Sequence, residues 1–353
     1  MNNDTHRNTI DRFDERDTLF SRVRLTPDTA LYNDYYKRRP ENTHIDDEFR
    51  SKEPGQFSNK LPEAPMVEAT FGLIARLRSL VRGYPGEYRY PGTDRPEPRE
   101  LTEYVKKQAG RYSAVFADSV EMEERFYYSV RGRGDRYGET VKNLLPRGFV
   151  CAVQMDKEEI STAPAIREAA EVAGSYLRAA VPALVIAAYL RSLGYEATAH
   201  IDGETEVVMP PVAEKAGFGK IGRHGLLVSK KYGSLLRLSV VTTDAPIVIS
   251  KSSSEVFPLE KACESCRRCA EFCPSDAIPG GSILDNWNNA VRSVDHEACY
   301  SMWKKFGTDC GVCLAVCPYN AGASAAASAG KNQKNTSKAE PESPDFLKKY
   351  MFG

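Results

Sequence analysis

The stretch CESCRRCAEFCP, residues 263–274, carries the most information about the fold of this chain. Its four cysteines are separated by two, two and three residues, and a proline follows the last one. A second run, CGVCLAVCP at 310–318, repeats the spacings of two and three residues and also ends in proline. Eight of the nine cysteines lie between Cys263 and Cys317. This density indicates metal ligation rather than a disulfide framework, because the rest of the 353-residue chain can build a core without cross-links.

The first run has the spacing of bacterial two-cluster ferredoxins, in which the fourth cysteine binds the other cluster. We therefore expect two 4Fe–4S clusters that exchange one ligand. The predicted ligands are Cys263, Cys266, Cys269 and Cys317 for the first cluster, and Cys273, Cys299, Cys310 and Cys313 for the second. Ten residues separate Cys299 from Cys310, so a free thiol at Cys299 is an alternative. Two zinc sites are the other alternative, since zinc also accepts four thiolates.

Composition and charge exclude several classes of protein. Lysine plus arginine equals aspartate plus glutamate at 48 each, so no net field favours nucleic acid or an anionic membrane. The longest apolar run, 179–190, is shorter than the about 20 residues that cross a bilayer. The first residues carry no signal-peptide pattern. These features predict a cytoplasmic protein, and association with a separate membrane partner stays open.

Four regions of the chain differ in composition. Residues 1–110 are rich in charge, proline and tyrosine and are predicted to form an extended wrap, with one amphipathic helix at 66–81. Residues 111–250 alternate strand and helix patterns, which indicates an α/β (α+β) domain that holds the substrate pocket. The ferredoxin-like module is expected at 251–320. Residues 321–353 have the composition of a flexible tail.

Within the α/β region the apolar patterns predict individual elements. Strands are expected at 113–116, 148–154, 226–229 and 236–242. A long helix is expected at 165–193, with a kink at Pro182 and an end at Gly194. Cys151 lies in the apolar run of the second strand and is predicted to be a small buried hydrophobe without a functional role.

The segment GFGKIG at 217–222 matches the glycine pattern of dinucleotide-binding proteins, and Asp244 follows at a suitable distance. That fingerprint has to follow a strand and open a helix. Here Pro210 and Pro211 begin a helix, and the glycines end it. A turn from helix to strand is therefore preferred over a nicotinamide site.

Several segments resemble the catalytic subunits of corrinoid-dependent reductive dehalogenases. They are RDTLFSR at 16–22, RSLGYEA at 191–197, AGFG at 216–219, GRHGLL at 222–227, KYGSLLRL at 231–238, TDAP at 243–246 and CYSMW at 299–303. The resemblance covers nearly the whole chain up to Asn320. The cysteine runs are shared with epoxyqueuosine reductases, so they do not discriminate between the two families.

The resemblance implies a nitroreductase-like core that holds a base-off corrinoid (cobalamin) against one cluster of the ferredoxin-like module. It implies reductive dehalogenation of an organohalide, with electrons from a donor protein or a membrane partner. One alternative is an epoxyqueuosine reductase, but the neutral charge balance disfavours a tRNA substrate, which needs a basic docking face. A non-catalytic iron–sulfur electron-transfer protein is a further alternative.

The resemblance also suggests catalytic residues. The family uses a tyrosine as proton donor, and Tyr176 is the matching position. A fixed cation would stabilise the phenolate left behind, and the match is open between Arg237, which we favour, and Arg223. Many relatives carry asparagine where this chain has Asp202, and a carboxylate there would oppose a developing phenolate and halide. Without the resemblance, Tyr176 would be taken for a core tyrosine with a satisfied hydroxyl.

Overall fold

A computed structural model describes residues 12–53, 55, 57–250, 259–281 and 294–321. The core of these residues is a four-stranded antiparallel sheet in the order β1-β2-β6-β3. The strands are β1 (Ala114–Glu121), β2 (Arg147–Gln154), β3 (Ala197–His200) and β6 (Leu236–Thr243). The central strand β2 is buried from Gly148 to Val153, as its continuous apolar sequence requires. The predicted strands at 148–154 and 236–242 are therefore confirmed.

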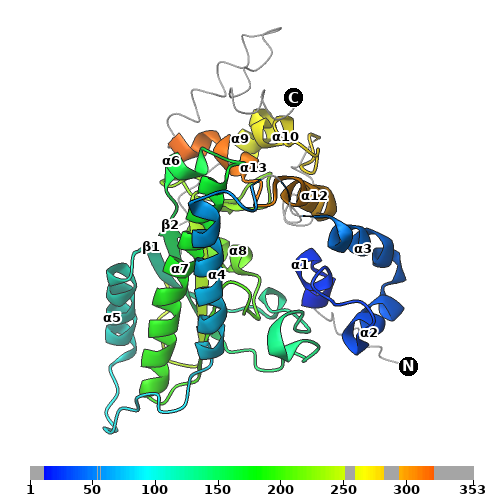
Figure 1. Cartoon of the computed structure of the whole chain (residues 1–353). Helices are drawn as coiled ribbons and strands as arrows, with labels where there is room; N and C mark the ends of the chain where they lie inside the picture. The colour runs from blue at the N-terminus through cyan, green and yellow to red at the C-terminus, as the bar shows by residue number, and fades with distance from the viewer. Residues whose placement is uncertain (1–11, 54, 56, 251–258, 282–293, 322–353) are drawn as a thin grey trace, which may run out of the picture.

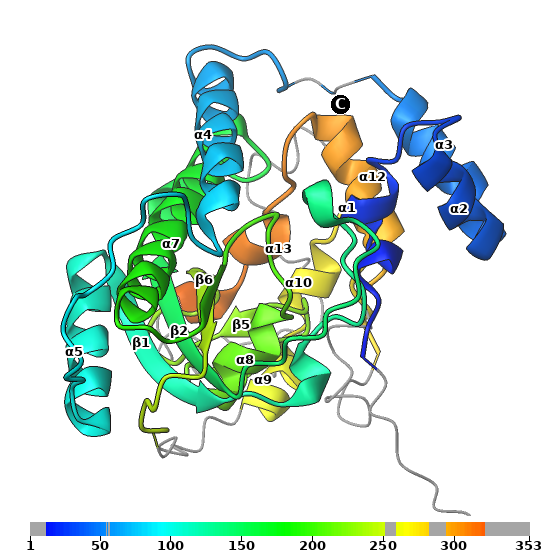
Figure 2. The same ribbon diagram turned by 90° about the horizontal axis from the view of Figure 1, so that it is seen from below.

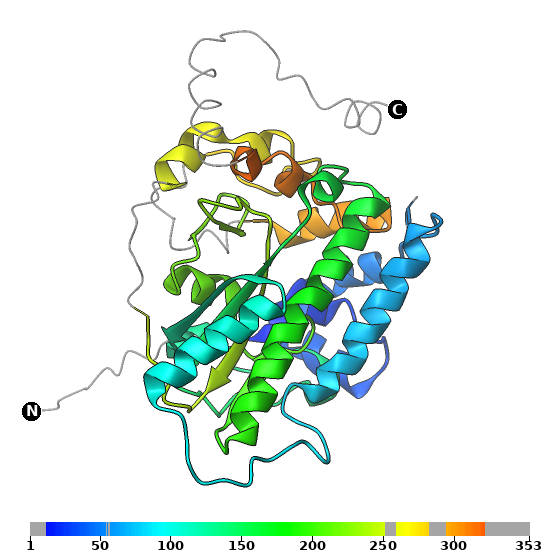
Figure 3. The same ribbon diagram turned by 90° about the vertical axis from the view of Figure 1, so that its left-hand side faces the viewer.

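Three helices cover one face of the sheet, as Figure 3 shows. They are α4 (Glu63–Leu77), α5 (Pro98–Arg111) and α7 (Ile166–Ser192). The small residues Ala180, Ala183 and Ala187 let α7 approach the sheet closely, and Ile186 and Leu190 fill the space beside them. Each such large apolar side chain contributes about 1.5–3 kcal/mol when it leaves water.

The central helix α7 runs unbroken through Pro182 and ends before Gly194, which has a φ of 90°. The predicted helix and its end are confirmed, whereas Pro182 does not interrupt it. By length and hydropathy α7 alone among the described helices would suit a membrane span, but half of its most apolar window is buried inside the protein. It is the core helix of this fold.

The opposite face of the sheet is covered by α8 (Met209–Lys215). After α8 the chain turns at Gly217, with a φ of 84°, and enters a two-stranded sheet of β4 (Lys220–Ile221) and β5 (Leu227–Val228). A side chain at Gly219 would meet the carbonyl oxygen of Val228 at 2.2 Å. The glycines thus serve a helix-to-strand turn, as predicted, and no strand leads into a helix here.

The N-terminal region differs from the predicted extended wrap. It forms three helices, α1 (Leu19–Arg22), α2 (Ala30–Arg38) and α3 (Thr43–Ser51), which lie beside the core in Figure 1. The predicted helix at 66–81 is confirmed as α4, but α4 and α5 belong to the core, because they pack on α7 and β1. Short 3-10 turns complete this region and the following loops: Glu15–Asp17, Pro40–Asn42, Arg78–Leu80, Glu124–Phe126 and Gly134–Arg136.

The cysteine-rich module lies over one end of α7 (Figures 1 and 2). Its elements are α9 (Leu259–Cys266), α10 (Arg268–Glu271), α12 (His296–Phe306), α13 (Val312–Ala315) and the 3-10 turn Pro318–Ala321. The short helix α6 (Lys157–Ile160) joins the module to the core through contacts with α7 and α13. The predicted tail from residue 322 lies outside the described residues.

Candidate functional site

The eight cysteines of the module fall into two groups. The first contains Cys263 and Cys266 on α9, Cys269 on α10 and Cys317 after α13. Burial, together with negative charge on Cys263, Cys317 and Cys266, raises the pKa of the Cys269 thiol to about 12. These four thiols therefore lie near one another, although 47 residues separate Cys269 from Cys317. We call them the first tetrad.

The second tetrad contains Cys273, Cys299, Cys310 and Cys313. Burial raises the pKa of Cys313 well above its usual value, and the charges of Cys310, Cys269, Cys299 and Cys273 add to this effect. The influence of Cys269 indicates that the two tetrads adjoin. Cys299 belongs to neither cysteine run; it comes from α12 and lies near Cys273.

The donor set of each tetrad consists of four thiols. A 4Fe–4S cluster takes four thiolates, each on a different iron, and a zinc ion accepts the same donors. The order of the cysteines, in which the fourth member of the first run joins the other tetrad, is that of two-cluster ferredoxins. The donor set therefore fits two cubane clusters.

Tyr176 and Arg237 come together between α7 and β6. The guanidinium carbon of Arg237 lies 4.0 Å from the centre of the Tyr176 ring. Arg237 donates hydrogen bonds to the hydroxyl of Ser175 (3.2 Å) and to the sulfur of Met155 (3.4 Å). The ring of Phe71 from α4 packs on the other side, with its centre 6.2 Å away. The positive charge is thus fixed over the phenol ring.

The hydroxyl of Tyr176 makes no hydrogen bond to any described residue. Arg237 lowers the pKa of Tyr176, while burial and the carboxylates of Asp202 and Asp309 raise it, and the net direction is upward from 10.0. Tyr176 is only partly buried, so its unpaired hydroxyl beside a fixed cation is available to solvent or to a ligand.

Two acidic side chains lie on the cluster side of this pair. Glu168 on α7 is 1% exposed, and neither of its carboxylate oxygens has a hydrogen-bond partner among the described residues. Burial and the charge of Asp309 raise the pKa of Glu168, and Arg237 opposes them. Burial likewise raises the pKa of Asp309 to about 6. The Arg237 guanidinium therefore faces carboxyl groups as well as the phenol.

Two ion pairs also contribute charges near Tyr176. Asp202 accepts a hydrogen bond from Arg78 at 2.9 Å, and that arginine also bonds the Asp202 carbonyl. Arg133 pairs with Glu15 at 2.8 Å and acts on Tyr176 through its charge. The negative charge of Asp202 is therefore offset by a close cation.

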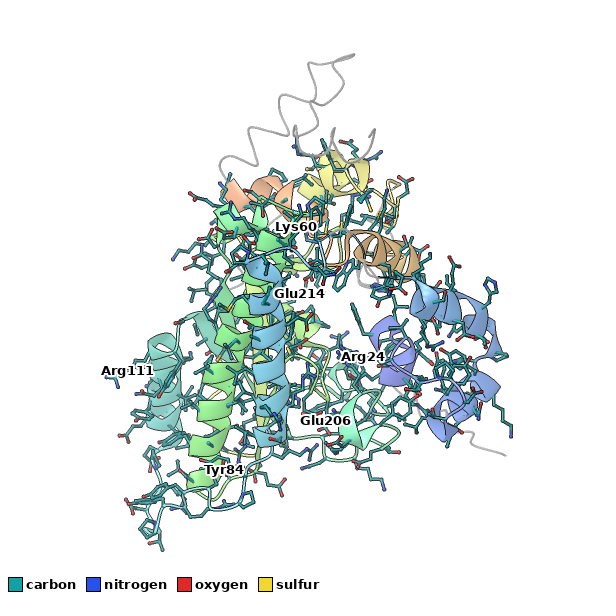
Figure 4. The ribbon with its side chains drawn as sticks, in the orientation of Figure 1. Arg24, Lys60, Tyr84, Arg111, Glu206 and Glu214 are labelled. Atoms are coloured by element: carbon teal, nitrogen blue, oxygen red, sulfur yellow. The ribbon has the colours of Figure 1, made fainter. Side chains whose placement is uncertain are left out.

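Arg24 follows α1, and Figure 4 shows it beside that helix. Arg24 is exposed, but partial loss of hydration lowers its pKa, and the charges of Arg133 and Arg78 lower it further, whereas Asp202 and Tyr300 raise it. No hydrogen bond or ion pair joins Arg24 to another described residue. The N-terminal helices thus bring an unpaired cation towards the group around Asp202.

An aromatic group links the N-terminal helices to the second tetrad. Phe20 on α1 packs against Tyr300 and Trp303, with ring centres 5.8 and 5.2 Å away. Both partners lie on α12 beside Cys299, and Trp303 donates a hydrogen bond to that thiol. Phe49 on α3 packs on Tyr300 at 5.1 Å. Helix α12 therefore joins a predicted cluster ligand to the aromatic side chains of α1 and α3.

Tyr176 lies on the side of the second tetrad. It packs with Cys313 in one apolar cluster, whose buried members are Met155, Ile160, Val172, Leu235 and Leu314. Asp309, which acts on both Tyr176 and Arg237, directly precedes Cys310. The first tetrad instead packs with Val228 and Tyr319. The second tetrad is the one close to the candidate proton donor.

Arg223, the other predicted partner of Tyr176, lies elsewhere. It is 1% exposed, and its guanidinium donates hydrogen bonds to the carbonyl oxygens of Cys263, Pro279 and Gly281. The structure therefore brings Tyr176 together with Arg237 and uses Arg223 at the first tetrad. Cys151 is 1% exposed with its pKa raised to about 12 by burial, as expected of an inert core thiol.

Residues 262–321 match the family model described as a 4Fe-4S dicluster domain, which covers both cysteine runs. Proteins named tetrachloroethene reductive dehalogenase are similar to about half of the chain. That of Desulfitobacterium hafniense is 34% identical over 183 residues, which are 49% of this chain and 32% of that protein. That of Sulfurospirillum multivorans is 31% identical over 189 residues, which are 52% of this chain and 37% of that protein. Over about half of its length, the chain is thus similar in sequence to proteins named reductive dehalogenases.

A solved reductive dehalogenase shares the fold over most of the chain. The catabolic reductive dehalogenase NpRdhA, in complex with 3-bromo-4-hydroxybenzoic acid, matches 92% of this chain and 44% of that protein, with a TM-score of 0.70 and 23% identity. An epoxyqueuosine reductase of Lactococcus garvieae is 37% identical over 116 residues, which are 31% of each protein. The matched part spans only about a third of the first curated reductive dehalogenases.

Sequence reasoning missed four residues around Tyr176. Glu168 and Asp309 were not expected, because 140 residues separate them and no motif joins them. Arg24 and Arg133 lie in regions whose fold could not be deduced from apolar periodicity. Only Arg24 lies in 1–110, where the charge-rich composition was the one available signal.

Proposed function

We propose that this protein is an iron–sulfur and corrinoid-dependent oxidoreductase that removes halide from an organohalide. The observation that carries this proposal is the unpaired hydroxyl of Tyr176, held under Arg237 and beside the second tetrad. Proton donor, fixed cation and electron source then meet at one place. Relatives named reductive dehalogenases over half of the chain support the same chemistry.

We assign a 4Fe–4S cluster to each tetrad, with the ligands Cys263, Cys266, Cys269 and Cys317 for the first and Cys273, Cys299, Cys310 and Cys313 for the second. The corrinoid, in its base-off form, would occupy a nitroreductase-like core on the Tyr176 side. Bound there, it would supply a cobalt centre that gathers two reducing equivalents, because iron–sulfur clusters deliver electrons one at a time. A cytoplasmic electron-donor protein, or a partner at the membrane, would reduce the clusters.

The side chains would handle the proton and the charges. Tyr176 gives its hydroxyl proton to the carbon that loses halide, and Arg237 stabilises the phenolate that remains. Arg78 offsets the charge of Asp202, so this carboxylate would oppose the phenolate less than an unpaired one. The pairing of Asp202 with Arg78 therefore makes an aspartate compatible with dehalogenation at a position where many relatives carry asparagine.

Replacing Tyr176 with phenylalanine tests the proposal. We expect halide release by the protein loaded with clusters and corrinoid to fall at least about 100-fold, the usual worth of a positioned general acid. Iron content and cluster spectra should not change. The control is Tyr189→Phe on the same helix, since Tyr189 packs against Tyr104 away from this site. Equal turnover by the Tyr176 and Tyr189 variants would refute the assignment of the proton donor.

A second candidate is epoxyqueuosine reduction, which the similarity to the Lactococcus garvieae enzyme over 116 residues favours. It would use the same clusters but a tRNA substrate, and the chain has no net positive charge to attract one. Incubation of the loaded protein with tRNA that carries epoxyqueuosine separates the two functions. Formation of queuosine without halide release from organohalides would replace our proposal.

A further inference from the structure

Arg223 carries a buried positive charge at the first tetrad. Its side chain is 0% exposed and lies in the turn between β4 and β5. The guanidinium donates two hydrogen bonds of 3.2 Å to the carbonyl of Cys263. Two more, of 2.7 and 2.8 Å, go to the carbonyls of Pro279 and Gly281. This fork is held in a single position, so its charge has a fixed place relative to the thiols.

The backbone of Arg223 also reaches the sulfur ligands. Its amide N–H donates a hydrogen bond to Cys263, which lowers the pKa of that thiol against the dominant effect of burial. The guanidinium charge acts in the same direction on both Cys263 and Cys269. One residue thus supplies an N–H bond to a ligand and a positive charge beside two of them.

The second tetrad lies nearer to carboxylates. The carboxylate of Glu168 lies against Gly311, between Cys310 and Cys313 in sequence, and Asp295 caps the helix that carries Cys299. Cys299 also accepts a hydrogen bond from Trp303, so the two tetrads differ in nearby charge rather than in hydrogen bonding. No cation is among the leading influences on Cys299, Cys310 or Cys313 in the described part of the chain. Reduction adds an electron to a cluster, and nearby positive charge and N–H bonds to sulfur favour the reduced state.

We propose that Arg223 is a positioning residue that sets the reduction potential of the cluster at the first tetrad above that of the cluster at the second. The inference rests on the proposed iron–sulfur function but not on the organohalide substrate. The first cluster would then hold the electron at equilibrium, and the second, beside Tyr176, would be the stronger reductant. Electrons would leave the chain from its more reducing cluster.

A carboxylate beside Arg223 provides a second variant for testing the proposal. Glu264 lies on α9 with its carboxylate 3.5 Å from Arg223. Its negative charge opposes that of the arginine at the same cluster. Removing Glu264 should therefore change the potential in the direction opposite to removing Arg223. Arg267 also lies near Glu264, at 4.0 Å, but its side chain is 46% exposed, so water screens its charge.

The experiment is an anaerobic titration with dithionite, followed by electron paramagnetic resonance of the cluster-loaded protein. Two potentials are expected. In Arg223→Gln the higher of the two reduction potentials should fall by about 59 mV. For a one-electron couple this equals about a tenfold change in the ratio of reduced to oxidised cluster. In Glu264→Gln the same potential should rise. Arg223→Lys should retain part of the shift, and Arg267→Gln should change neither potential.

Three results would overturn the proposal: no shift in either variant, equal shifts of both clusters, or shifts of the same sign for Arg223→Gln and Glu264→Gln. The Arg223→Gln variant could fail to take up clusters. In that case Glu264→Gln decides alone: if the higher reduction potential does not rise in that variant, the proposal is rejected. Loaded protein without halide release would contradict the proposed function while leaving this inference standing. Protein that binds no clusters would contradict both.

Discussion

Arg237 has two opposing effects at Tyr176. Its charge, 4.0 Å from the ring centre, is the largest influence on the phenol and lowers its pKa. Burial and two carboxylates more than cancel this, so the pKa lies above 10.0. The phenol is thus protonated throughout the neutral range, and the cation matters most after the proton has left. A general acid of this kind loses activity only as the pH rises through its pKa.

Arg237→Gln should therefore alter the pH profile in a defined way. Loss of the cation raises the pKa of Tyr176 further, so the alkaline limb of kcat should move to higher pH. The same change makes the phenol a weaker acid, and kcat near pH 7 should fall by roughly tenfold or more. Halide release measured from about pH 6 to about pH 12 checks both effects, because the pKa of a free phenol is already about 10. An alkaline limb that moves to lower pH would contradict the assigned pair.

The sequence predicted the surroundings of the cysteines better than those of Arg237 and Arg223. Arg237 and Arg223 looked equivalent, because both lie in segments that resemble the same family. The pairing of β6 with β2, in which Arg237 faces Val153, determines which arginine reaches α7. Such a register follows from contacts distant in sequence. The cysteine spacing, in contrast, is a local signal: residues 262–321 match a 4Fe-4S dicluster domain, and the assignment of ligands to each tetrad stays a prediction.

At the scale of elements, α12 connects most parts of the site. It carries Cys299 at its first turn, and Tyr300 and Trp303 pack against Phe20 of α1. Its N-terminus is capped by Asp295, whose carboxylate accepts hydrogen bonds from Glu297 and Ala298. The cap fixes where the helix begins and hence the direction of Cys299. A fixed direction for the Cys299 thiol is what a cluster ligand requires, whereas a free thiol does not require it.

Cys299→Ser should lose the second cluster. We expect about half of the iron and labile sulfide of the unchanged protein, because one of two four-iron clusters is missing. Cys151→Ser is the matched control: Cys151 is buried in β2, away from both tetrads, and its replacement should keep the full iron content. Equal iron in the two variants would show that Cys299 is not a ligand.

The elements themselves were predictable where apolar periodicity controls them. Helix α7 and strand β6 have such patterns, since each buries one face against the core. Helices α2 and α3 do not, because polar contacts hold them. Tyr36 on α2 bonds Asp46 on α3 at 2.9 Å, and Arg50 donates to the same hydroxyl. A pattern that looks for apolar faces therefore misses these helices.

In the whole molecule, the N-terminal helices lie beside the core and pack against α12 (Figure 1). One buried ion pair stabilises their position: Arg22 lies 3.5 Å from Asp46, which is 0% exposed, and also bonds Glu297 of α12. The same region pairs with the core where Gly132 donates its amide to Glu15 at 2.8 Å. The helices are thus attached both to the cluster module and to the core.

Arg22→Ala should destabilise the protein strongly. It leaves Asp46 buried without its cation, which typically costs about 3–5 kcal/mol. The thermal midpoint of the cluster-loaded protein should fall by several degrees. Arg39→Ala removes an exposed pair with Asp17 and should change the midpoint little. Equal midpoints for the two variants would mean that the pair at Asp46 does not hold the N-terminal helices.

The account as a whole requires that a corrinoid bind beside Tyr176 and the second tetrad. The most direct measurement is the visible spectrum of cobalamin added anaerobically to the cluster-loaded protein and freed of excess by gel filtration. We predict that cobalamin stays with the protein in about one-to-one amount and shows the base-off spectrum. Protein that keeps its clusters but releases all cobalamin, or holds it only base-on, would contradict the account.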